Sequence, residues 1–116
     1  MYQYFAQVTK VTDGDTFDAT LDLGFTVEVK QTFRLAKVNA PEKKGVTLEA
    51  GLKSKAELER LILGKKVIVH SFKPDTSIKQ EKYGRYLAMV VICEGENKGL
   101  IVNEHLVQNG YAVAYM

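Results

Sequence analysis

The first 35 residues alternate apolar and polar side chains, and this pattern constrains the fold more than any other feature of the chain. Apolar residues recur at every second position over much of residues 4–11, 17–23 and 25–35, which is the period of a strand with one buried face. Asp13-Gly14-Asp15 separates the first two segments and Gly24 the next two, and both are typical of tight turns. We therefore expect a meander of three antiparallel strands.

The rest of the chain adds a long helix, two strands and a short helix. After Pro41, which cannot donate a strand hydrogen bond, apolar residues recur at intervals of three and four over 47–63, and Gly64 is a typical residue after a helix end. Segments 66–72 and 86–93 predict two more strands, and 100–108 a short C-terminal helix closed by Gly110. Five strands with a helix between the third and fourth predict a mainly β, α+β fold, a five-stranded OB-type barrel forming one domain over 1–116.

The composition excludes several classes of protein. Cys93 is the only cysteine, and the two histidines are distant in sequence, which excludes disulfide scaffolds, zinc fingers and iron-sulfur proteins. His70 and His105 have no carboxylate partner at a recognisable spacing, so we expect no catalytic or ligand role for them. No segment approaches the roughly 20 apolar residues of a membrane span, and the N-terminus lacks a signal-peptide pattern. We expect a monomer without membrane contact, cytoplasmic as given or secreted if a leader has been removed.

Three polar clusters lie at the predicted strand ends, in residues 13–16, 34–42 and 82–85. Each has a simple structural explanation, as a turn, an exposed strand charge or a loop. Together they suit phosphodiester hydrolysis, which requires charge neutralisation and a positioned water. An arginine such as Arg34 can donate two parallel hydrogen bonds to a phosphate. A calcium ion can use oxygens from Asp15, Asn39 and the Ala40 carbonyl, and Glu42 can orient or deprotonate the water.

The motifs VTDGDT (11–16), FRLAKVNAPE (33–42), KYGRYLA (82–88) and VNEHLVQNGYA (102–112) closely resemble, in this order, those of the staphylococcal nuclease, or thermonuclease, family. The resemblance implies an OB barrel and a calcium-dependent phosphodiesterase that cleaves DNA and RNA on the 5′ side of the phosphodiester. It also implies that Asp15 is a metal ligand and that Glu42 acts on the water. Phosphate contacts are implied for Arg34 and Arg85, and nucleotide contacts for Lys82, Tyr83 and Tyr115.

Asn39 and Ala40 depart from the family pattern, which has a second metal-binding aspartate followed by a threonine. Asparagine keeps a carbonyl oxygen for calcium but removes one negative charge, and the number of ligand charges tunes calcium affinity. The sequence therefore predicts a weaker calcium site, which Asp13 serves indirectly beside Asp15.

The distribution of charge favours a nucleic-acid partner. The net charge is only +2, but residues 28–85 hold 14 Lys and Arg against 7 Asp and Glu. Such a basic segment attracts a polyanion, and tyrosines can stack on bases without selecting a sequence; an ordinary solvated surface is the alternative. The sequence predicts a calcium-dependent endonuclease that cleaves DNA, RNA or both, single-stranded or frayed, with little sequence specificity. The alternatives are a nucleic-acid-binding module weakened in catalysis by Asn39, and a small domain for protein contacts.

Overall fold

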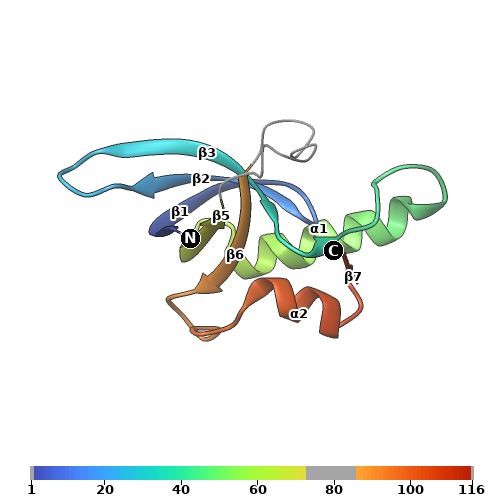
Figure 1. The fold of residues 1–116 in the computed structure, drawn as a ribbon. Coiled ribbons are helices and arrows are strands. Elements are labelled where there is room, and N and C mark those ends of the chain that lie inside the picture. Colours follow the sequence, from blue (N-terminus) through green and yellow to red (C-terminus); the bar gives the residue numbers. More distant parts are fainter. Residues whose placement is uncertain (1, 73–85, 116) are drawn as a thin grey trace.

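The computed structural model describes residues 2–72 and 86–115, and its centre is a closed barrel (Figure 1). Its strands follow the order β1-β2-β3-β6-β5 and comprise β1 (Tyr2–Asp13), β2 (Thr16–Asp22), β3 (Glu28–Leu35), β5 (Lys66–Phe72) and β6 (Tyr86–Ile92). β1 pairs antiparallel with both β2 and β5, and a short parallel ladder between β3 and β6 closes the barrel. This mixed five-stranded barrel with two helices confirms the predicted α+β, OB-type fold.

The long strand β1 pairs with β2 along one edge and with β5 along the other, and it bends along its length. Its register with β2 shifts between Val8 and Lys10 and again between Val11 and Asp13, and such bulges bend a strand and increase its twist. The inward side chains of all five strands then fill the barrel. Phe17 and Phe33 are fully buried and stack with ring centroids 5.5 Å apart, and each such side chain contributes roughly 1.5–3 kcal/mol by its burial.

The hairpin between β2 and β3 extends away from the barrel (Figure 1), and the predicted start of its second strand is wrong. We expected the third strand to begin at residue 25, but β3 begins at Glu28. Phe25 and Thr26 have φ values of 54° and 64°, and the Val27 N–H donates to the Gly24 carbonyl at 2.9 Å. Two central residues with positive φ form a type I′ turn, so the alternation of this segment reflects a turn and not a strand.

Both helices lie on the same side of the barrel (Figure 1). The long helix α1 (Leu48–Ile62) follows a short 3-10 turn, η1 (Gly45–Thr47), and buries Leu58, Leu61 and Ile62 completely. The shorter α2 (Val102–Gln108) packs against β6. Both predicted helices are confirmed to within about two residues. No helix in the described parts of the chain is long and apolar enough to cross a membrane.

A second sheet, too short to be predicted, joins two distant parts of the chain. β4 (Val38–Asn39) pairs antiparallel with β7 (Val113–Ala114). The Tyr115 N–H adds a hydrogen bond of 2.9 Å to the Lys37 carbonyl. Lys37 itself has a φ of 62°, a conformation that is uncommon for a residue other than glycine. This sheet fixes the C-terminal residues beside the end of β3.

Asn103, at the start of α2, fastens the helix to the seam where β3 and β6 meet. Its side chain is 3% exposed and makes three hydrogen bonds to backbone groups. The amide nitrogen donates to the Ala36 carbonyl at 2.9 Å and to the Ala88 carbonyl at 3.0 Å, and the amide oxygen accepts from the Val90 N–H at 3.0 Å. One buried amide therefore joins the end of β3, the strand β6 and the helix α2.

A carboxylate on α1 joins the two helices. Glu57 is 9% exposed, and its oxygens accept two hydrogen bonds from Arg60, at 2.8 and 2.7 Å. His105 of α2 lies 2.7 Å away from Oε2 of the same carboxylate through Nε2. Hydrogen bonding by Arg60, reinforced by His105, lowers the pKa of Glu57. His105 thus has a carboxylate partner, 48 residues away in sequence, which the expectation from local spacing missed.

We expect Asn103→Ala to destabilise the fold by about 3 kcal/mol, because an unsatisfied buried polar group costs about 1–3 kcal/mol and this change leaves several. Chemical denaturation measures the loss. Gln108→Ala, on the exposed part of the same helix, is the control. A loss equal to that of the control would show that Asn103 does not fasten the seam.

The contacts of Glu57 with Arg60 and His105 make the free energy of unfolding depend on pH in the acid range. Because the folded-state pKa of Glu57 lies below its ordinary value of 4.5, its contribution is complete above that pH and is lost as the pH falls through the folded-state pKa. We expect Glu57→Gln to be less stable than wild type near neutral pH and the difference to shrink in acid. Denaturation from pH 7 to 2 tests this, with Glu49→Gln on an exposed part of α1 as control. A difference that stays constant with pH would contradict it.

Candidate active site

A polar cavity of about 330 Å³ lies where the β1–β2 turn meets the end of β3 and the segment after β4. Its walls contain six of the residues singled out in the sequence, together with Pro41 and two lysines. The lining residues are Asp13, Asp15, Arg34, Asn39, Ala40, Pro41, Glu42, Lys43 and Lys44. The fold thus brings two of the three predicted polar clusters together, although 17 residues lie between Thr16 and Arg34 in the sequence.

The carboxylate of Asp15 is buried and fixed by three donors. Asp15 as a whole is 8% exposed. Oδ1 accepts a hydrogen bond from the Thr16 hydroxyl at 3.1 Å, and Oδ2 accepts one from the Ala40 N–H at 3.0 Å. Arg34 Nη2 approaches Oδ2 at 3.5 Å. The Asp15 carbonyl accepts from the Leu35 N–H at 2.8 Å, so both the backbone and the side chain of Asp15 are held in place.

Gly14 is required in this turn for a reason other than the predicted one. The hairpin itself is confirmed, since Asp13 pairs with Thr16. However, Gly14 is not among the glycines with positive φ. A Cβ at this position would overlap the buried Ser54 side chain of α1 and would lie 2.9 Å from the Cβ of Ala40. The glycine therefore allows the turn to pack closely against α1, which sets the depth of Asp15 below the surface.

Arg34 connects the parts of the cavity. Its Nη2 donates to Asn39 Oδ1 at 3.1 Å as well as approaching Asp15, and its Nη1 lies 3.5 Å from the Leu35 carbonyl. The guanidinium carbon lies 5.6 Å from the ring centroid of Tyr115, within the range of a cation–π interaction. With 15% of its side chain exposed, Arg34 is a preorganised cation at the cavity wall. Tyr115 reaches it only because β4 pairs with β7.

The remaining charges of the cavity lie nearer to solvent. Asp13 pairs with Lys43 at 3.3 Å, and the Lys43 ammonium also donates to the Thr12 carbonyl at 2.7 Å. Glu42 pairs loosely with Lys44 at 3.7 Å, and its side chain is 73% exposed. Glu42 is thus a hydrated carboxylate at the rim, where it is accessible to water.

The donors at the cavity resemble a calcium site in kind but supply little charge. Asp15 Oδ2 and Asn39 Oδ1 already share one positive charge, Nη2 of Arg34. The Ala40 backbone meets Asp15 through its N–H. Among residues 2–72 and 86–115, no group of three or more His, Cys, Asp or Glu side chains is placed to hold a metal ion. A calcium ion, which takes about six to eight oxygens, would therefore share these donors with Arg34 and complete its shell with water.

The third predicted cluster cannot be placed. Arg85, Lys82 and Tyr83 lie outside the described residues. The functional connections that sequence reasoning missed are the β4–β7 pairing, which brings Tyr115 to Arg34, and the bond from the Ala40 N–H to Asp15. Both depend on contacts between segments that are distant in sequence, and no local pattern indicates them.

The fold and the site together define an OB-type barrel protein with a charged cavity beside the first hairpin. The family model described as Staphylococcal nuclease homologue matches residues 32–116, and the chain therefore belongs to the staphylococcal nuclease homologue family. The match includes Arg34, Asn39, Glu42 and Tyr115, whereas Asp15 precedes it. A comparison with curated proteins finds no match. Membership suggests a nuclease-like hydrolase with a nucleic-acid substrate.

Proposed function

We propose that this chain is an endonuclease that hydrolyses phosphodiester bonds of DNA, RNA or both, in single-stranded or frayed regions and with little sequence specificity. The observation that carries the proposal is the placement of Arg34. Its guanidinium is held by a buried carboxylate, an amide oxygen and an aromatic ring at the wall of an open polar cavity. A donor fixed in this way can stabilise developing negative charge without reorganising. Family membership points to the same chemistry.

Each residue that we propose to act on the substrate has an assigned role. Arg34 binds a nonbridging phosphate oxygen, and Arg85 binds the phosphate from its own segment. Glu42, hydrated at the rim, orients a water molecule and accepts its proton as the water attacks phosphorus in line with the leaving oxygen. Tyr115, on the ring face of Arg34, contacts the nucleotide. Lys82 and Tyr83 are proposed to contact the nucleotide as well.

Calcium is the proposed cofactor, held by Asp15, Asn39 and the Ala40 carbonyl. When bound, the ion would supply additional positive charge to the phosphate. Asp13 serves this site indirectly, because its ion pair with Lys43 removes one lysine from competition for Asp15. Arg34 is already paired with Asp15 and Asn39, so we propose a low calcium affinity.

The alternative is a nucleic-acid-binding module with little or no catalysis. The contact that favours it is the hydrogen bond from Arg34 to Asn39. With asparagine at position 39, Asp15 is the single carboxylate that contacts Arg34 in the part of the chain that the structure describes, so the guanidinium neutralises this donor set by itself. A cavity of this kind still binds phosphate, and its affinity for nucleic acid would fall steeply with salt.

We expect Glu42→Gln to lower the rate of oligonucleotide cleavage by about 100- to 10,000-fold, since the amide cannot accept the water proton. Arg34→Lys keeps the charge but loses the planar fork, and we expect a loss of about 100-fold. Cleavage of a labelled single-stranded oligonucleotide measures both. Glu104→Gln, exposed on α2, is the matched control, and thermal melting verifies folding. If both variants cleave like wild type, the assigned roles are wrong.

Calcium dependence separates the enzyme from the binding module. We expect cleavage to appear with added calcium and to stop with a chelator, and Asn39→Asp to tighten calcium binding because it adds a ligand charge. Titration calorimetry with calcium alone measures the binding. Salt-sensitive binding of the oligonucleotide without cleavage, at any calcium concentration, would favour the module. An unchanged calcium isotherm for Asn39→Asp would exclude residue 39 from the metal site.

A further inference from the structure

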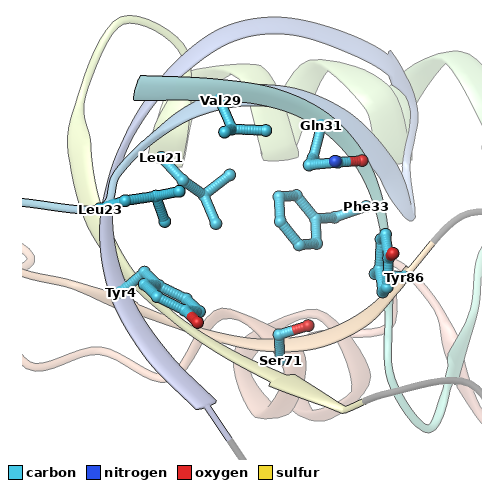
Figure 2. Close-up of a pocket in the computed structure, with 8 residues that line it drawn as sticks. All are labelled: Tyr4, Leu21, Leu23, Val29, Gln31, Phe33, Ser71 and Tyr86. Atoms are coloured by element: carbon cyan, nitrogen blue, oxygen red, sulfur yellow. The ribbon is translucent and has the colours of Figure 1, made fainter. Parts of the chain in front are cut away.

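The mouth of the barrel contains a second cavity, separate from the charged one. It has a volume of about 300 Å³ and is bounded by side chains from all five barrel strands (Figure 2). Its described lining is Tyr4, Leu21, Leu23, Val29, Gln31, Phe33, Ser71 and Tyr86. None of these side chains is charged, and apolar surface predominates. A pocket at the lower end of the range of roughly 300–1,000 Å³ accommodates one small ring system.

Ser71 and Gln31 are polar side chains at inward-facing strand positions, where the alternating pattern predicts apolar residues. Residues 67, 69 and 71 face the inside of the barrel from β5, and the first two are valines that are fully buried. Ser71 follows them and is 9% exposed. In β3, Gln31 lies between Val29 and Phe33 on the face that lines the cavity. The alternation that builds the barrel is therefore interrupted twice, at the same opening.

Neither of these polar side chains has a hydrogen-bond partner within the described residues. Ser71 is nine-tenths buried and its hydroxyl points into the opening, while Gln31 lies on the facing wall (Figure 2). Ser54 Oγ is the only buried side-chain nitrogen or oxygen without a partner among the described residues, so the Ser71 hydroxyl and the Gln31 amide keep contact with solvent at the opening. Valine at 71 or leucine at 31 would continue the apolar pattern. The two groups are thus arranged as recognition groups for something that enters the opening.

The lining restricts the chemistry of the occupant. The absence of charged residues from the described lining disfavours a phosphate or a carboxylate, because an unpaired charge in an apolar pocket is strongly destabilised. The rings of Tyr4 and Tyr86 offer surface for stacking, whereas Phe33 is 1% exposed and stacks on Phe17. The Gln31 amide presents a donor and an acceptor side by side, the pair that recognises the N6 and N7 edge of adenine. A flat, neutral heterocycle fits this set.

We propose that the barrel mouth binds a nucleobase, with adenine preferred, through Gln31 and Ser71 and by stacking on the aromatic lining. The choice of a nucleobase among flat heterocycles rests on the proposed function. Phe33 lines the mouth and the next residue, Arg34, lines the charged cavity, so β3 contributes to the two cavities from its opposite faces. Phe33 also pairs with Tyr86 in the ladder that closes the barrel. The proposed base pocket is therefore a site separate from the charged cavity, on the other face of this strand.

Adenosine, which has no phosphate, tests the base pocket separately from the charged cavity. We expect saturable changes in the NMR resonances of the Leu21 and Val29 methyl groups, and weaker binding of uridine. Gln31→Leu should weaken adenosine binding by roughly tenfold or more, as loss of a bidentate base contact does. Ser71→Leu, which fills the opening, should abolish it. Gln3→Leu, exposed on β1, is the matched control and should bind like wild type.

The outcomes are distinguishable from those for the nuclease. Arg34→Lys should lose cleavage but keep adenosine binding. If adenosine causes no saturable change while wild-type protein cleaves the oligonucleotide, the base pocket is wrong and the proposed function stands. If adenosine binds but Gln31→Leu and the control bind it equally well, the mouth is an unselective apolar cavity and the proposal is overturned. Adenosine binding without cleavage supports the pocket and counts against the nuclease. Circular dichroism of each variant confirms folding.

Discussion

The hydrogen bonds of Asn103 are the interaction on which the rest of the structure depends. A barrel closed by a short parallel ladder is weak at its seam, because β3 and β6 share only three residue pairs. The Asn103 amide bonds to Ala36 just beyond that ladder on β3, and on β6 to Ala88 at its end and Val90 beyond it. Asn103 is also the second residue of α2. Fixing Ala36 at the end of β3 also fixes the direction in which the chain leaves the barrel toward β4. The charged cavity lies along that path, so Asn103 stabilises the β3–β6 seam and also helps to position the cavity.

The electrostatics of the cavity follow from how deeply the first hairpin packs. Gly14 lets the turn approach α1, which buries Asp15. A buried carboxylate must be paired or hydrogen-bonded, and Asp15 takes an N–H from Ala40 and the guanidinium of Arg34. These partners come from segments that the seam holds in place. Arg34 is therefore positioned by the fold itself and needs no ligand to order it, which is the property that a phosphate-binding arginine requires.

The sequence predicted what depends on local pattern and missed what depends on distant pairing. Strand alternation, helix spacing and Gly64 located most elements, because burial of one face imposes a period. The alternation also misled, at Phe25, where a turn with positive φ continues an apolar pattern. No local sequence pattern indicated the contact between His105 and Glu57, since the two residues meet only when α1 packs against α2. The candidate site residues were proposed from the resemblance and from the chemistry of their side chains, whereas the contact between Tyr115 and Arg34 follows from the β4–β7 pairing.

The balance of charge at Asp15 connects the proposed binding of calcium to the proposed binding of phosphate. With asparagine at position 39, one carboxylate faces one guanidinium, and the donor set facing Arg34 is close to neutral. A cation bound at Asp15 would take over part of the charge neutralisation that Arg34 provides, and more of the guanidinium charge would then be available to a phosphate oxygen. A phosphate oxygen bound to Arg34 in its present position would in turn neutralise part of the guanidinium charge that opposes a cation at Asp15. Cation and phosphate binding would then favour each other through one shared arginine, because each reduces the charge that opposes the other. In the proposed nuclease, a bound phosphate would in this way compensate for the carboxylate that position 39 lacks.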